Sequence, residues 1–251
     1  MERVVISSPA RFAAAVGAHP FSDITFEADA LDGARASLRA ANLLIVGEPH
    51  GVRETPSVLY ALAVALGIRA LAFEWSHEEV DATVQGFLRD GSFDFDRLWS
   101  LPTSSEFFCG DGRVTAGHFA LLQRLYTEGR IDQVIVFDRL DPEPPGDWES
   151  QVRAREPELA ARLLNEWDRR LPLLVLTGAF HAQFQAAEGE PMTAYLAREL
   201  PGLQPAMLDY SAGCCWSSGE THDVSGPMPD APIRFDLGHA TPAVVPAPTI
   251  P

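Results

Sequence analysis

The sequence is poor in several features that mark particular classes of protein. Only three of its 251 residues are cysteine, and Cys109, Cys214 and Cys215 form neither a disulfide framework nor a Cys-x-x-Cys zinc pattern. Basic residues number 19 against 35 acidic ones, which gives a net charge of −16. Because no basic stripe is present to neutralise phosphates, we expect neither nucleic acid nor an anionic membrane surface as a partner.

Long apolar runs and common catalytic fingerprints are also missing. No stretch approaches the roughly 20 apolar residues needed to span a bilayer. The N-terminus shows no basic segment followed by an apolar one, so we expect a cytoplasmic protein with reduced cysteines. A Gly-x-Ser-x-Gly elbow, a Walker loop and a dinucleotide fingerprint are absent. Serine or cysteine nucleophile chemistry therefore has no support in the sequence.

Short apolar runs alternate with helical patterns along most of the chain, which is typical of α/β proteins. This order predicts a three-layer α/β fold with a central, mainly parallel β-sheet and helices on both faces. We expect one domain over residues 1–240 and a disordered Pro-rich tail over 241–251. Residues 91–113 are expected to be irregular and 141–146 to form a loop. The predicted strands are 43–46, 68–73, 133–137, 173–177 and 204–208, and the predicted helices are 55–66, 76–88, 115–128, 156–170 and 191–200.

Two Gly-x-x-His turns each close an apolar strand-like run. The first is Gly47-Glu48-Pro49-His50, and the second is Gly178-Ala179-Phe180-His181. A third run, 70–73, ends in Glu74. Because parallel strands bring their carboxyl ends to one edge of a sheet, and ligands bind there, His50, Glu74 and His181 should converge on one site.

The first of these turns is crowded with ionisable side chains. Glu48, His50 and Glu54 lie within seven residues, and a carboxylate beside an imidazole orients it for general-base catalysis. The same pair could ligate a metal ion, or the segment could be a strand-to-helix loop with solvated charges. The alternative role for Glu74 is that of a helix cap.

Two further segments each allow a functional and a purely structural interpretation. Asp111-Gly112-Arg113 has the composition of a turn, in which Arg113 is either solvated or clamps an anion. Asp138 follows the predicted strand 133–137, either as a member of the site or only as the residue that terminates the strand.

On these motifs the sequence resembles the erythromycin esterase / ChaN / Tiki superfamily. The resemblance rests on Gly-Glu-Pro-His-Gly-x-x-Glu at 47–54, Glu74, and Gly-Ala-Phe-His at 178–181. The Asp111-Gly-Arg113 turn before a leucine-containing helix also looks like members of this group, as does the helix Arg155-Glu-Pro-Glu-Leu-Ala-Ala-Arg-Leu163. The similarity covers roughly residues 40–210, and it implies an α/β core whose cleft is lined by the two histidines and the glutamates.

The resemblance implies three kinds of chemistry: hydrolysis with the first histidine activating water, metal-dependent proteolysis, and haem binding. The leading hypothesis is a hydrolase for a small ester, lactone or amide. The alternatives are a haem or small-ligand carrier, and a biosynthetic enzyme of specialised metabolism that uses the same cleft for elimination or rearrangement. Under the leading hypothesis His50 is the base, Glu74 orients it or shares its role, and His181 and Arg155 bind substrate or stabilise the oxyanion.

The expected catalytic residues are His50, Glu74, His181 and Glu48, and the expected substrate-binding residues are Glu54, Arg155, Arg113 and Asp111. A divalent metal, if bound, would be held by His50, Glu74 and His181, the three-ligand pattern of an open catalytic site. Arg155 beside such a site would favour a metal-free anion pocket instead.

Overall fold

A central sheet organises the chain. The structure, a computed structural model, describes residues 5–102, 104, 108, 110–138, 147–226 and 228–247, without the side chains of 77–79 and 148. In this part of the chain, a seven-stranded sheet has the order β4-β3-β5-β2-β6-β7, with β8 also paired to β6. All its neighbouring strands are parallel except the β6–β7 hairpin. The strands are β2 (Leu43–Glu48), β3 (Ala70–Ser76), β4 (Gln133–Asp138), β5 (Leu173–Gly178), β6 (Ala206–Ser217), β7 (Glu220–Asp223) and β8 (Ile233–Ala240).

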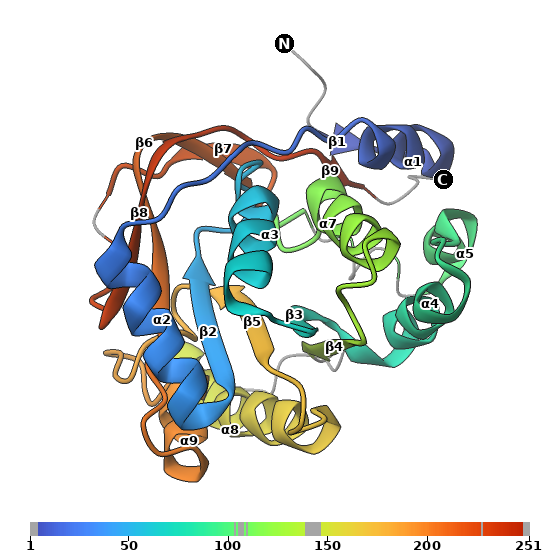
Figure 1. Cartoon of the computed structure of the whole chain (residues 1–251). Coiled ribbons are helices and arrows are strands. Elements are labelled where there is room, and N and C mark those ends of the chain that lie inside the picture. The colour runs from blue at the N-terminus through green and yellow to red at the C-terminus, as the bar shows by residue number, and fades with distance from the viewer. Residues whose placement is uncertain are drawn as a thin grey trace.

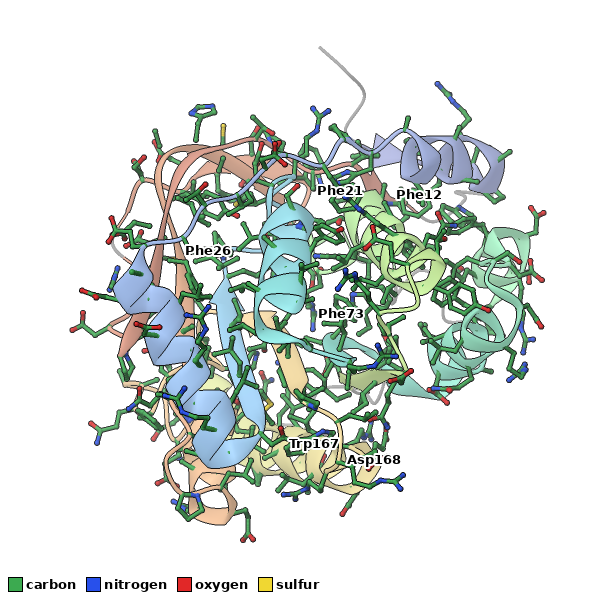
Figure 2. All side chains as sticks on the ribbon, in the orientation of Figure 1. Phe12, Phe21, Phe26, Phe73, Trp167 and Asp168 are labelled. Carbon is green, nitrogen blue, oxygen red and sulfur yellow. The ribbon has the colours of Figure 1, made fainter. Side chains whose placement is uncertain are left out.

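Helices cover both faces of this sheet (Figure 1). They are α1 (Pro9–Gly17), α2 (Ala28–Ala41), α3 (Thr55–Leu66), α4 (His77–Asp90), α5 (Phe95–Ser100), α7 (Ala116–Thr127), α8 (Trp148–Glu166) and α9 (Met192–Glu199). One core joins α1, α3, α4, α5 and α7 to one face, and a second core joins α8 and α9 to the other. Figure 2 shows Phe12 and Phe73 in the first core, and Trp167 in the second. The predicted three-layer α/β fold is confirmed.

The central strands are buried on both faces, as their continuous apolar runs require. Every residue of β2, β3 and β5 is buried. The helices between them follow the expected signals. Pro56 lies in the first turn of α3, and Gly67 ends that helix in the left-handed conformation with φ 67°. The Thr115 side chain caps α7 by accepting the His118 backbone N–H.

The structure differs from the sequence predictions in several elements. Residues 95–100, expected to be irregular, form the short helix α5, whose N-cap Asp94 accepts the Arg97 N–H. Helix α8 begins at Trp148 rather than near Glu156, so Pro157 lies inside it. The capping interaction of Asp147 with the Ser150 N–H stabilises this earlier start. The loop expected over 141–146 lies outside the described residues.

The Pro-rich segment was expected to be disordered from residue 241, which is wrong for residues 241–247. Here β9 (Val245–Pro246) pairs in parallel with β1 (Val5–Ile6). Ala243 and Val245 are buried, at 3% and 1% exposure. Proline lacks a backbone N–H but its ring and neighbours still bury apolar surface, so a Pro-rich composition does not prevent packing at a sheet edge. Residues 248–251 lie outside the described part.

Candidate active site

The two Gly-x-x-His turns follow two strands that are neighbours in the sheet, so the turns lie side by side. Strand β2 pairs with β5 in register, so Gly47 lies opposite Thr177 and Glu48 opposite Gly178. Strand β3, which carries Glu74, is the other neighbour of β5. Three carboxyl ends of parallel strands thus meet at one edge of the sheet. The structure brings His50, Glu74 and His181 together there, although they come from widely separated segments.

Glu74 is the hub of this site. It lies where the register between β3 and β4 shifts, between Phe73 and Ser76, and such irregularities re-aim side chains. Its Oε2 accepts hydrogen bonds from the Thr177 hydroxyl at 2.7 Å and the Gly178 N–H at 2.9 Å. Glu74 as a whole is 5% exposed. Burial opposes ionisation, but the nearby cationic groups hold the pKa of Glu74 well below its ordinary value.

Two arginines join Glu74 to a second carboxylate, Asp138. Arg155 donates from Nη2 to Glu74 at 3.0 Å and to Asp138 at 2.8 Å, and its Nε lies 3.2 Å from Asp138. Arg113 donates to Glu74 at 3.2 Å and also to Asp138 and Asp111. Burial lowers the pKa of Arg155, but Glu74 and Asp138 more than offset this and raise it. Asp138 is therefore part of the ion cluster, not only a strand terminator.

His181 lies between the carboxylates of Glu74 and Glu156. Its Nδ1 is 2.8 Å from Glu156 Oε2 and its Nε2 is 3.2 Å from Glu74 Oε1. Burial lowers the pKa of His181, but Glu74 and Glu156 outweigh it and raise the pKa to about 9. Both ring nitrogens then carry protons at neutral pH and both donate. The raised pKa favours the imidazolium form of His181, which can donate to Glu74 and Glu156 at once.

Glu156 is a functional candidate that the sequence reasoning missed. Its side chain is buried, and Oε2 also accepts the Met192 N–H at 2.7 Å. It therefore ties α8 and the start of α9 to His181. The available signal was its position directly after Arg155, but an acidic residue on a predicted helix is usually solvated, and nothing in the sequence marked it as buried.

His50 has a different environment. Its Nδ1 lies 3.2 Å from Glu48 Oε1, and the Glu48 side chain is only 1% exposed. Because a carboxylate only accepts, the hydrogen of this contact comes from Nδ1. The Nε2 lies 3.8 Å from Glu74, and the side chain is 21% exposed. The carboxylate that orients His50 is thus Glu48, whereas Glu74 faces the opposite nitrogen.

The glycines of both turns are required by close packing. A Cβ on Gly178 would lie 2.9 Å from His50 Nε2, so the His50 ring occupies the space that the missing side chain leaves. A Cβ on Gly47 would lie 2.5 Å from the Met207 sulfur and 2.7 Å from the Ala182 Cβ. The missing side chain of Gly178 therefore leaves room for the His50 ring, and that of Gly47 leaves room for neighbouring core atoms.

Glu54, which we expected to bind substrate, is engaged elsewhere. Both of its oxygens accept from Thr241, one from the backbone N–H at 2.8 Å and one from the hydroxyl at 2.6 Å. A carboxylate used in this way has less capacity left for a ligand. His118 is buried on α7, and its ring centroid lies 5.5 Å from that of Phe73.

The residues predicted as metal ligands do not fit that role. Among the described residues, no group of three or more His, Cys, Asp or Glu side chains has an arrangement that could hold a metal ion. Both oxygens of Glu74 already accept hydrogen bonds, Oε1 from Arg155 and Oε2 from the Thr177 hydroxyl. Two guanidinium groups beside Glu74 would also repel a cation.

Comparison with known proteins identifies relatives in fold only. No family model and no curated protein matches the chain. Among solved structures, it is similar to a protein from Bacillus cereus, with a TM-score of 0.63 and 9% identity over 96% of this chain and 100% of the other. The type III effector HopBA1 gives 0.50 and 15% over 86% of this chain and 98% of the effector. The C-terminal region of Pasteurella multocida toxin, described as having a thiol-protease-like catalytic triad, gives 0.50 and 13%, covering 80% of this chain and 28% of the other.

Proposed function

We propose that this chain is a hydrolase for a small, uncharged ester, lactone or amide, with His50 as the general base. The observation that carries the proposal is the Glu48–His50 pair. A buried carboxylate on Nδ1 fixes the tautomer and stabilises the imidazolium that forms when Nε2 takes a proton from water. Glu48 is the last residue of β2 and His50 lies on the turn after it, at the sheet edge where α/β enzymes bind ligands.

In this proposal the guanidinium of Arg155 stabilises the negative charge that develops on the substrate. Its Nε and Nη2 are held by Glu74 and Asp138, which leaves Nη1 outside these bonds. After water adds to the carbonyl carbon, the oxyanion would accept from this group, and the His50 imidazolium would return its proton to the leaving oxygen or nitrogen. Because Arg155 is fixed before substrate arrives, little reorganisation is needed.

The charge balance of the site favours an uncharged substrate. Among the described residues, the cluster contains five carboxylates and four cationic groups, a balance without a positive excess to attract a phosphorylated molecule. These groups are Glu48, Glu74, Asp111, Asp138 and Glu156 on one side and Arg113, Arg155, Arg162 and His181 on the other. The toxin domain among the structural neighbours is compatible with hydrolysis. We assign no nucleophile role to Cys215, which is buried.

The experiment is a screen of esters, lactones and amides, followed by His50→Ala on any substrate found. Loss of a general base costs about 10²–10⁴-fold in rate, so kcat should fall by that factor while KM changes little. His239→Ala, on an exposed residue, is the matched control. A His50→Ala enzyme with near wild-type turnover would remove the proposed base. Membership of the erythromycin esterase / ChaN / Tiki superfamily is part of the same proposal, supported by the motifs at 47–54 and 178–181.

A further inference from the structure

The turn that carries His50 is held by segments that follow it by more than 150 residues. The carbonyl of Gly51 accepts two backbone hydrogen bonds, from Trp216 at 3.1 Å and from Ala243 at 2.8 Å. Arg53 donates its backbone N–H to the Thr241 carbonyl at 2.9 Å. Residues 241–247, which we name the C-terminal strap, thus bond to the backbone on both sides of Val52.

Glu54 adds side-chain bonds to this backbone ladder. It accepts the N–H and the hydroxyl of Thr241, at 2.8 and 2.6 Å. Val52 and Pro242 form an antiparallel bridge between the same two segments. Thr241 therefore bonds through its N–H, its carbonyl and its hydroxyl, and all three bonds go to residues 53 and 54. A threonine that only ended a strand would not need this set of contacts.

The strap is itself anchored to the rest of the fold. Val244 accepts the backbone N–H of Ala116 at 2.8 Å, at the start of α7, and Val245 pairs with Val5. The His50 turn has little room to move against these anchors. A Cβ on Gly51 would lie 1.8 Å from the Trp216 carbonyl oxygen, and one on Gly112, in the turn that carries Arg113, would lie 2.7 Å from Gly51 Cα.

We propose that Glu54 and Thr241 are positioning residues for His50. Their bonds fix the turn between β2 and α3 so that the His50 ring stays between Glu48 and Gly178. The role of the ring in catalysis rests on the proposed function, whereas its fixation by the strap does not. Displacement of a catalytic group by about 1 Å can cost about 10²-fold in rate. The strap therefore acts on the reaction without touching the substrate.

The test compares Thr241→Val, which removes only the hydroxyl, with Thr241→Ser, which keeps it. Thr127→Val is the control, because the Thr127 hydroxyl makes a local 2.8 Å bond to the Gln123 carbonyl within α7. Two readouts need no substrate: the ring ¹⁵N and ¹H signals of His50, and amide hydrogen exchange at Arg53. Turnover is measured as well once a substrate is known.

We expect Thr241→Val to shift or broaden the His50 ring signals and to speed exchange at Arg53 about tenfold, since the bond lost is to a charged group. Thr241→Ser and Thr127→Val should resemble wild type. Unchanged His50 signals and Arg53 exchange in Thr241→Val, or equal changes in Thr127→Val, would overturn the proposal. If Thr241→Val does not fold, Glu54→Gln is measured in its place, because it keeps the shape of the side chain and weakens both of its bonds with Thr241. If the strap result holds but His50→Ala stays active, only the catalytic assignment fails.

Discussion

Gly178→Ala offers a sharp test of the site, because it adds one methyl group directly beside the proposed base. The new Cβ would lie 2.9 Å from His50 Nε2 and 3.4 Å from its Cε1. Ordinary contacts begin at 3.4 Å, so the ring must move by about half an ångström or tilt. The ring tip can yield, since the His50 side chain is 21% exposed and no backbone atom lies closer to the added methyl group. The fold should therefore survive.

The expected result is a loss of activity without a loss of stability. Because misplacement of about 1 Å costs about 10²-fold, half that displacement should lower kcat/KM by about tenfold, with the thermal midpoint nearly unchanged. Circular dichroism melts and steady-state kinetics are the assays. Gly226→Ala is the control, since a Cβ there meets no atom within 4 Å. A Gly178→Ala enzyme with full activity and unshifted His50 ring signals would refute the placement of the base.

Further expectations concern charge and packing. The folded pKa of His181, about 9, lies above its ordinary value of 6.5. Its contribution to the free energy of unfolding should therefore be complete below pH 6.5 and lost as the pH rises through 9. The loss should be on the order of 3 kcal/mol, measured by urea titration at a series of pH values. Folding lowers the pKa of Glu74, so the same titration should show the free energy of unfolding falling in acid, below the ordinary pKa of a glutamate. Gly47→Ala should cost about 1–3 kcal/mol in unfolding free energy, because its methyl group would lie 2.7 Å from the Ala182 Cβ and 3.2 Å from the Ala179 Cα, which can move only with the backbone. Glu48→Gln should lower kcat much as His50→Ala does, with KM retained. Dialysis against a chelator should leave turnover unchanged, because the candidate metal ligands are already hydrogen-bonded; a loss restored by one divalent ion would contradict this.

The sequence predicted the sheet and the convergence of its strand ends well, for physical reasons. Apolar runs such as 173–177 are buried on both faces, so their composition alone marks them as central strands. Because the strands are parallel, the residues that follow them must lie at the same edge of the sheet. The meeting of His50 with His181 follows from this rule, because β2 and β5 are neighbours in register.

The partners within the site were less predictable, because they depend on helices packing against the strand ends. The positions of Glu156 and Arg155 relative to His181 depend on how α8 lies on the sheet, and helix periodicity does not contain that information. The role of Glu54 depends on a segment 187 residues later in the chain, whose composition indicated disorder. In both cases a long-range contact decides what a local charge does.

The order of strands in the sheet also has a consequence for synthesis on the ribosome. Strand β2 is made early, but both of its partners, β5 and β6, come from the second half of the chain. Leu43 pairs with Leu173, so at 5–20 residues per second β2 waits roughly 7–26 s for its first neighbour. During that interval an apolar segment with two unpaired edges is exposed. We expect slow assembly and a need for protection of the nascent chain, with His50 brought into its final surroundings only after most of the chain has emerged.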